Sequence, residues 1–206
     1  MKKPIRISVL LLTVLACIMP GGCTVNGAEP LTLYDLGLLR TSQGNTVVPA
    51  LPPISVAEVS APAWLDSPMM FFRLAYANDQ QPRPYGTSRW SMPPAQLFVQ
   101  RLKLRIGEAG GVVLSASDGA TNVPVLRIAA DDFTQVFTSS GQSIAQISVR
   151  ASMLDGRTLV AQKTFTKQMP APTADASGGV RALADTCDAI IIDMMNWLAG
   201  LPLKKY

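Results

Sequence analysis

A strict alternation of apolar and polar residues runs through the second half of the chain and limits the folds open to it. From residue 145 to 153 every second side chain is apolar, and Gln, Ser or Arg stand between. A period of two predicts a strand with one buried and one wet face. Asp155-Gly156 predicts a hairpin turn, and residues 159–165 predict the partner strand. The chain must therefore form a sheet whose apolar face is buried by other elements that pack against it.

Two amphipathic helices could cover that face. Apolar residues recur at three- and four-residue steps between Ala95 and Ala109, and again over residues 180–201. Pro93-Pro94 suit the first turn of the first helix, and Ser91 is its expected N-cap. Three basic residues are expected to lie largely off its apolar face: Arg101, Lys103 and Arg105.

Further strands are predicted around both helices. Five segments carry apolar patterns: residues 31–36, 54–59, 69–76, 112–114 and 123–137, the last a long strand with an irregularity at Asp131-Asp132. Residues 77–88, with Pro82 and Pro84, are expected to form an exposed loop or bent edge, and residues 168–179 a linker. The order β-β-β-α-β-β-β-β-α predicts an α+β domain, a mostly antiparallel sheet with two helices on one face.

The N-terminus has the features of a secretory signal. Three basic residues precede an apolar run from Ile7 to Met19, which leads into Pro20-Gly21-Gly22-Cys23. The run is too short to span a bilayer, which takes about 20 apolar residues. A cysteine directly after two glycines indicates the lipoprotein form of the signal. We therefore expect lipidation at Cys23.

This reading divides the chain into three parts. Residues 1–22 are the expected signal peptide, 23–30 a flexible tether and 31–202 the folded domain. Lipidation at Cys17 is an alternative, since Val14-Leu15-Ala16 precedes it, and so is an ordinary exported protein with unmodified cysteines. Cys187 lies on the apolar face of the last helix, where a small buried hydrophobe is expected.

Composition argues against several classes of function. The chain contains no histidine, which removes Ser-His-Asp and Cys-His nucleophile systems and His-containing zinc sites. No phosphate loop or GxGxxG fingerprint is present. Without its leader the chain carries 15 basic and 14 acidic residues, so nothing favours nucleic acid as a partner. We expect no catalytic residue, no metal and no cofactor, hence no enzyme.

Several short motifs together resemble a known family. Tyr34-Asp-Leu-Gly37 follows the expected lipidation site, and Pro62-Ala-Trp-Leu-Asp66 precedes an apolar strand that contains Arg73. Tyr85 and Arg89-Trp90 then lead into the helix that begins near Pro93-Pro94. In order and spacing these motifs resemble the ABC-type transport auxiliary lipoproteins, the PqiC-like group, over most of residues 31–200.

The resemblance implies a role in the bacterial cell envelope. Such lipoproteins are held at the outer membrane by their lipid and face the periplasm. They engage an MCE-type (mammalian cell entry) substrate-binding protein and, through it, an inner-membrane ABC permease and ATPase that move lipid. Some members form rings, so a homo-oligomer is a further expectation. Thr24 follows Cys23 where inner-membrane retention typically needs Asp, which by the same resemblance favours the outer membrane.

Four residues are candidates for binding a partner. Tyr, Trp and Arg are enriched at interface hot spots, and this region contains Arg73, Tyr85, Arg89 and Trp90. Two of them have a structural alternative: Trp90 as a packing residue before a helix, and Arg73 as the partner of a carboxylate such as Asp66. A surface suited to lipid could use five methionines, although core filling is their commoner role: Met69, Met70, Met92, Met194 and Met195.

Three functions remain open from sequence. The favoured one is the auxiliary lipoprotein of a lipid-transport system. The second is an outer-membrane lipoprotein adaptor that regulates cell-wall or surface-polymer assembly. The third is a small envelope enzyme, disfavoured by the missing histidine and by the lack of paired acids.

Overall fold

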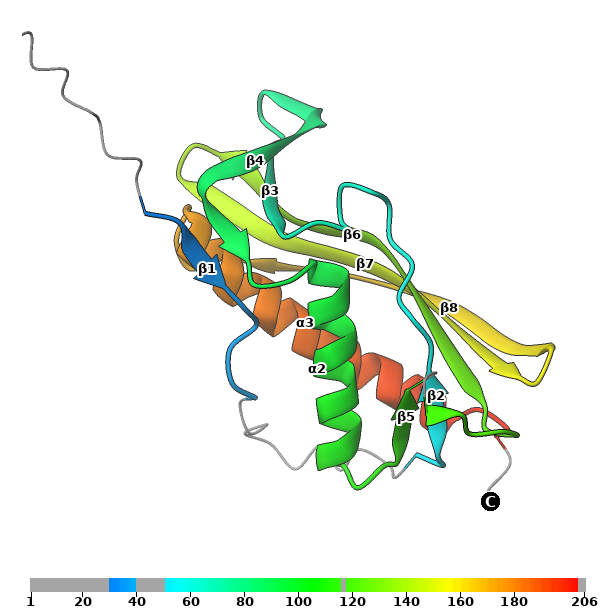
Figure 1. The fold of residues 1–206 in the computed structure, drawn as a ribbon. Coiled ribbons are helices and arrows are strands. Elements are labelled where there is room, and N and C mark those ends of the chain that lie inside the picture. Colours follow the sequence, from blue (N-terminus) through cyan, green and yellow to red (C-terminus); the bar gives the residue numbers. More distant parts are fainter. Residues whose placement is uncertain (1–29, 40–50, 116–117, 204–206) are drawn as a thin grey trace, which may run out of the picture. The chain divides into compact units, whose positions relative to one another are not determined.

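A long three-stranded antiparallel meander forms one side of the sheet (Figure 1). It consists of β6 (Val125–Ser139), β7 (Gln142–Asp155) and β8 (Thr158–Pro170). The β7–β8 turn has Gly156 at a φ of 58°, a conformation that glycine adopts without strain. The β6–β7 register shifts between Ala130 and Asp132. Both the hairpin and the irregularity at the two aspartates are therefore confirmed.

The computed structural model describes residues 30–39, 51–115 and 118–203, and residues 31–206 make up one compact unit. The expected signal peptide over residues 1–22, Cys17, Cys23 and nearly all of the 23–30 tether lie outside the described residues.

Five shorter strands extend the sheet. They are β1 (Thr32–Tyr34), β2 (Ile54–Val56), β3 (Met69–Leu74), β4 (Asn78–Trp90) and β5 (Val113–Ser115). The strand order is β1-β4-β3-β6-β2-β5, and β7 and β8 follow from the other edge of β6. Four pairs run parallel: β1–β4, β3–β6, β2–β6 and β2–β5. The sheet is thus mixed, and the expectation of a mostly antiparallel sheet was wrong.

Residues 77–88, for which we expected an exposed loop or bent edge, form most of β4, an irregularly paired strand that lies largely at an edge of the sheet. β4 pairs antiparallel with β3, and β1 joins it only at residues 88–90. Pro82 and Pro84 therefore lie where β4 has β3 as its one described partner. A proline is tolerated at a sheet edge, because its missing N–H need not serve a second neighbour.

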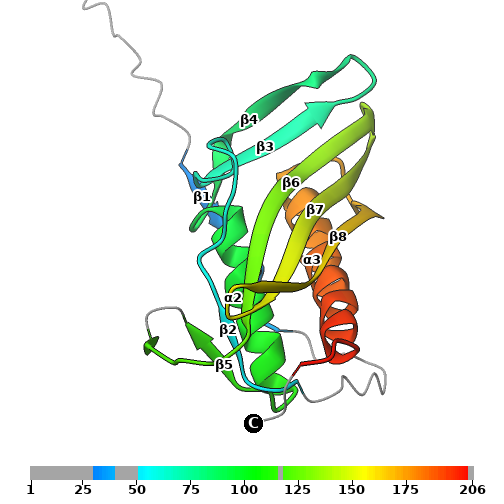
Figure 2. The ribbon, with the colours of Figure 1, turned by 90° about the vertical axis from the view of Figure 1, so that its right-hand side faces the viewer.

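Both helices lie on one face of the sheet (Figures 1 and 2), as expected. α2 (Pro94–Glu108) has Pro93 at its N-cap and no side-chain cap, so the assignment of Ser91 to that position was wrong. α3 (Ala176–Ala199) begins inside the expected linker, because the Asp175 carboxylate caps it by accepting from the N–H of Gly178. β8 reaches Pro170, so the linker shrinks to residues 171–175.

The core lies between the helices and the inward side chains of the sheet. The predicted alternation in β7 is confirmed, since its inward residues from Ala145 to Met153 have no exposed area. Cys187 in α3 is also fully buried, and burial raises the pKa of its thiol. It behaves as the small hydrophobe that its position on the helix predicted.

Arg101 departs most clearly from the predicted pattern of α2. It is only 4% exposed, although we expected it off the apolar face. Its Nε and Nη2 donate to the two carboxylate oxygens of Asp188 in α3, each over 2.8 Å. Its Nη1 donates to the carbonyl of Gly37 over 2.7 Å. Arg105 also donates to Asp188, over 3.0 and 3.3 Å. This arginine–aspartate cluster (Arg101, Arg105 and Asp188) joins both helices to the segment after β1.

Candidate partner-docking surface

The four sequence-predicted residues all lie on the β3–β4 hairpin. Arg73 is in β3, and Tyr85, Arg89 and Trp90 are in β4. Met69 pairs with Arg89 at the base of the hairpin, and Leu74 pairs with Asn78 near its turn. The far end projects away from both helices (Figures 1 and 2). All four candidates therefore lie on one hairpin, some at its base and some closer to its turn.

Trp90 and Tyr85 point into the domain. Trp90 is 1% exposed, and its ring meets Phe133 edge-on with the centroids 5.6 Å apart. The Tyr85 hydroxyl donates to Oε1 of Gln135 over 2.7 Å, and its ring lies 4.7 Å from that of Phe72. Burial, with a smaller effect of Asp175, raises the pKa of the Tyr85 hydroxyl. Both side chains attach β4 to β6, so any partner contact at them would need this packing to open.

The two arginines are half-buried and bound to backbone carbonyls. Nη1 of Arg73 donates to the carbonyl of Asp79 over 2.9 Å, and its guanidinium lies 5.8 Å from the centre of the Trp64 ring. Its hydrogen bond thus runs to Asp79 and not to Asp66, the carboxylate weighed from sequence. Nη1 of Arg89 donates to the carbonyls of Tyr85 and Ser88. These bonds hold both cations close to the hairpin.

Sequence reasoning missed two residues near the tip of the hairpin. Tyr76 is 53% exposed, and Arg83, paired with Phe72, is half-buried and donates to the side chain of Gln81. The signal was present as Asn78-Asp79, a turn-type pair that directly follows the turn at residues 75–77. We call Arg73, Tyr76 and Arg83 the hairpin-tip surface. It offers two cations and one aromatic ring, the side-chain types that dominate hot spots.

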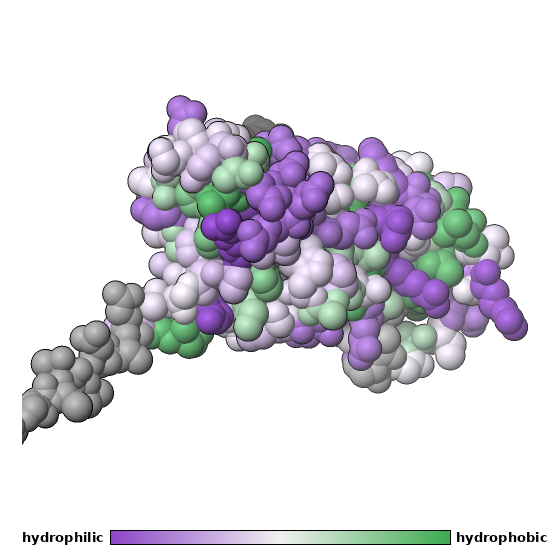
Figure 3. Space-filling view, turned by 90° about the horizontal axis from the view of Figure 1, so that it is seen from above, coloured by the Kyte–Doolittle hydropathy of each residue, from purple (hydrophilic) through white to green (hydrophobic). Residues whose placement is uncertain are grey.

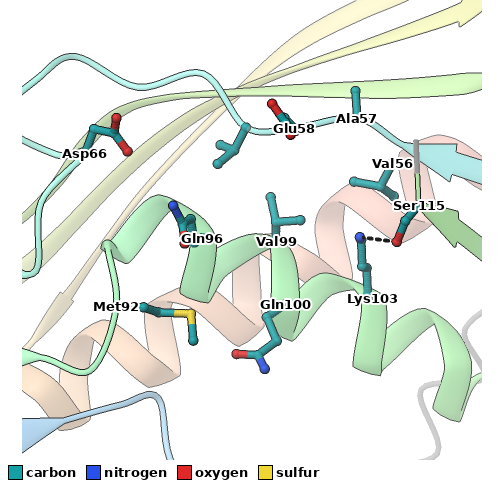
Figure 4. A pocket seen from close by; sticks show the side chains of 11 residues that line it. Val56, Ala57, Glu58, Asp66, Met92, Gln96, Val99, Gln100, Lys103 and Ser115 are labelled. Carbon is teal, nitrogen blue, oxygen red and sulfur yellow. Dashed lines mark hydrogen bonds between the residues drawn. The ribbon is translucent and has the colours of Figure 1, made fainter. Parts of the chain in front are cut away.

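A second concave region lies between α2 and the segment that follows β2 (Figure 4). This groove has a volume of about 750 Å³. Val56, Met92 and Val99 contribute apolar surface, and Glu58 and Asp66 contribute exposed carboxylates. Lys103 crosses toward β5 and donates to the Ser115 hydroxyl over 3.0 Å (Figure 4). The groove can hold a segment with both polar and apolar side chains. Its lining contains no nucleophile paired with a histidine base.

The described residues offer little to reaction chemistry. Within them, no three Cys, Asp or Glu side chains come together as a metal site. Neither helix in that part of the chain is both long and apolar enough to cross a bilayer. No buried side-chain nitrogen or oxygen there lacks a hydrogen-bond partner.

Comparisons with known proteins agree with this description. A family model for the ABC-type transport auxiliary lipoprotein component matches residues 34–194. The solved structure of protein XCC0632 from Xanthomonas campestris is similar, with a TM-score of 0.68 at 19% identity, covering 82% of this chain and 95% of that one. A solved structure titled as an uncharacterized protein has a TM-score of 0.62 at 16% identity, covering 82% and 99%. Curated protein sequences give no match.

Proposed function

Because this chain belongs to the family of ABC-type transport auxiliary lipoprotein components, we propose that it is a non-catalytic lipoprotein that serves an ABC-type lipid transport system of the cell envelope. One observation carries this proposal: the family model spans nearly the whole folded domain, from the β1 motif to the last turns of α3. The specific resemblance in the motifs of residues 34–102 points to the MCE-linked branch of such systems.

The anchor in this proposal is lipid on Cys23, with the outer membrane as its location and the domain on the periplasmic side. The leader, the two glycines before Cys23 and Thr24 after it support that arrangement. The mass of the mature N-terminus tests the anchor. A chain cleaved before an acylated Cys23 is expected, and an unmodified Cys23 would contradict it.

Docking to an MCE-type substrate-binding protein is assigned to the hairpin-tip surface. Tyr76 is exposed at the turn of the hairpin, Arg73 lies in β3 and Arg83 in β4, and the far end of the hairpin projects away from the helices. These are residue types that are enriched at interface hot spots. The energy for transport would come from the permease and ATPase, since this sequence has no phosphate loop. Self-association into a homo-oligomer is part of the same proposal.

Photo-crosslinking in cells tests this docking. A benzophenone side chain at Tyr76 is expected to capture the MCE-type protein, because Tyr76 is exposed at the tip. The matched control is the same side chain at Leu159, which is 55% exposed but lies at the β7–β8 turn. Equal capture from both positions would exclude the tip as the docking surface. Capture of a penicillin-binding protein from Tyr76 would select the adaptor function.

A further inference from the structure

Large apolar side chains are exposed on the outer face of β1 and its neighbours. Leu33 pairs with Arg89 in β4, and Arg89 pairs with Met69 in β3. Directly paired residues point to the same face of a sheet, so these three side chains form a row across the three strands. Leu33 is 63% exposed and Met69 is 42% exposed. Leu31, two residues before Leu33, is 57% exposed.

On the opposite face, the residues of β4 that pair with β1 are already buried. Tyr34 pairs with Trp90, and Thr32 pairs with Ser88, and both β4 residues are under 9% exposed. The outer row is therefore apolar surface that the core does not use. Edge strands usually carry charges or prolines that prevent unwanted contacts, whereas exposed Leu33 lies in β1 at an edge of the sheet and exposed Leu31 directly precedes that strand. A patch of this kind marks a contact surface.

Chain geometry indicates what covers the patch. Leu31 follows Cys23 by eight residues, which can span at most about 28 Å when fully extended. A lipid on Cys23 would therefore keep β1 within that reach of the bilayer at all times. Figure 3 shows hydrophobic patches among polar residues at its left-hand end, where β1 lies in Figure 1, and another at its right-hand end.

The chemistry of the row suits the boundary between headgroups and acyl chains. Leucine and methionine gain by leaving water there, and a neighbouring arginine can keep its charge among the phosphates while its stem stays in apolar surroundings. Arg89 lies between Leu33 and Met69, and its bonds to the carbonyls of Tyr85 and Ser88 hold it at the row. The surface of a bilayer offers both an apolar environment for Leu33 and Met69 and phosphates for Arg89.

We propose that Leu31, Leu33 and Met69, with Arg89, form a membrane-seating patch that rests on the leaflet in which the Cys23 lipid is inserted. This inference rests on the lipid anchor of the proposed function. The lipid holds the protein at the membrane, and the patch fixes which way the domain faces. Seating on β1 and the base of the β3–β4 hairpin would give the hairpin tip a constant direction relative to the bilayer.

Lipid-quenching of a site-specific fluorophore tests the patch. The full lipidated protein with Leu33→Cys is labelled with an environment-sensitive dye and placed in phosphatidylethanolamine–phosphatidylglycerol vesicles. Cys187 is fully buried and a lipidated Cys23 has no free thiol, so the dye reports position 33. We expect nitroxide lipids to quench it several-fold more strongly than a dye at Leu159→Cys, the equally exposed control.

A second variant separates seating from anchoring. In Leu31→Ser combined with Met69→Ser, the protein is expected still to float with the vesicles while quenching at position 33 falls to the level of position 159. Equal quenching at both positions in the otherwise unchanged protein would overturn the patch while leaving the anchor intact. If the dye is shielded from water but is not quenched by nitroxide lipids, a protein partner or a second copy covers this surface. That result would also overturn the patch. A chain that does not float would refute the anchor, and the patch with it.

Discussion

Asp188 is the residue on which the contact between the two helices depends. It is 16% exposed and accepts hydrogen bonds from both Arg101 and Arg105. Burial raises the pKa of Asp188, but the hydrogen bonds and charges of the two arginines outweigh burial and hold that pKa below its ordinary value. The cluster therefore needs the ionised carboxylate.

Asp188→Asn removes that charge and leaves two half-buried or buried cations against a neutral side chain. We expect the free energy of unfolding at pH 7 to fall by about 3 kcal/mol, measured by urea denaturation. The matched control is Asp193→Asn, because Asp193 is 51% exposed and pairs with Lys167 at the surface. That change should cost no more than about 0.5 kcal/mol.

The same pair of proteins gives a pH test. A carboxylate whose folded-state pKa is lowered stabilises the fold fully above its unfolded-state pKa of about 4, and this stability is lost as pH falls through the folded-state pKa. The free energies of unfolding of the unchanged protein and of Asp188→Asn should therefore approach each other as pH falls below about 4. If the difference between the two free energies of unfolding stays constant down to pH 3, the arginines do not stabilise the ionised carboxylate of Asp188.

Arg101 was misplaced from sequence for a physical reason. A cationic residue in an amphipathic helix is normally solvated, and the pattern of α2 contains no sign of the carboxylate that buries it. Asp188 is 87 positions away in the chain and belongs to another helix. Trp90 could be predicted better, because an aromatic just before a helix commonly packs inward, the alternative weighed for it from sequence.

At the scale of elements, α3 approaches β6 most closely at its first turn. Gly179 is buried, and a Cβ there would collide with Oε1 of Gln135. Gln135 in turn accepts from Tyr85 and donates to the Ser143 hydroxyl and the carbonyl of Asp175. Glycine is therefore needed at position 179, because a larger residue would displace the Gln135 side chain, which bonds to Tyr85, to Ser143 and to the backbone before α3.

Gly179→Ala is expected to lower the free energy of unfolding by about 2 kcal/mol, because the added methyl displaces the Gln135 side-chain amide. The control is Gly107→Ala in α2, where nothing lies within 4 Å of the added atom. There the better helix propensity of alanine should raise stability by up to about 1 kcal/mol. Thermal denaturation of both variants measures the contrast, and equal shifts would contradict the close approach.

Strands and helices with strong local patterns were predictable, and their partners were not. The alternation in β7 and the face of α3 follow from residues two to four positions apart. The parallel pairings join segments far apart in the chain, such as β1 with β4 and β3 with β6. β4 was missed because Pro82 and Pro84 indicate a loop unless the free edge of the strand is known.

At the scale of the whole molecule, the hairpin connects the proposed surfaces. Its base carries Arg89 and Met69 of the membrane-seating patch, and its tip carries Tyr76 and Arg83. The arginine–aspartate cluster holds the segment after β1 on the helices. In this account the domain is a rigid spacer between a lipid anchor and a partner protein.

Affinity purification of the lipidated protein from its own membranes shows whether it docks to a transport system through its hairpin tip. We expect an MCE-type protein, an ABC permease and its ATPase to be recovered with it. A combined Tyr76→Ala and Arg83→Ala change should reduce that recovery several-fold, while Leu159→Ala should leave it unchanged. Recovery of the lipoprotein alone, or equal recovery with both variants, would contradict the central claim that this protein acts by docking to a transport system through its hairpin tip.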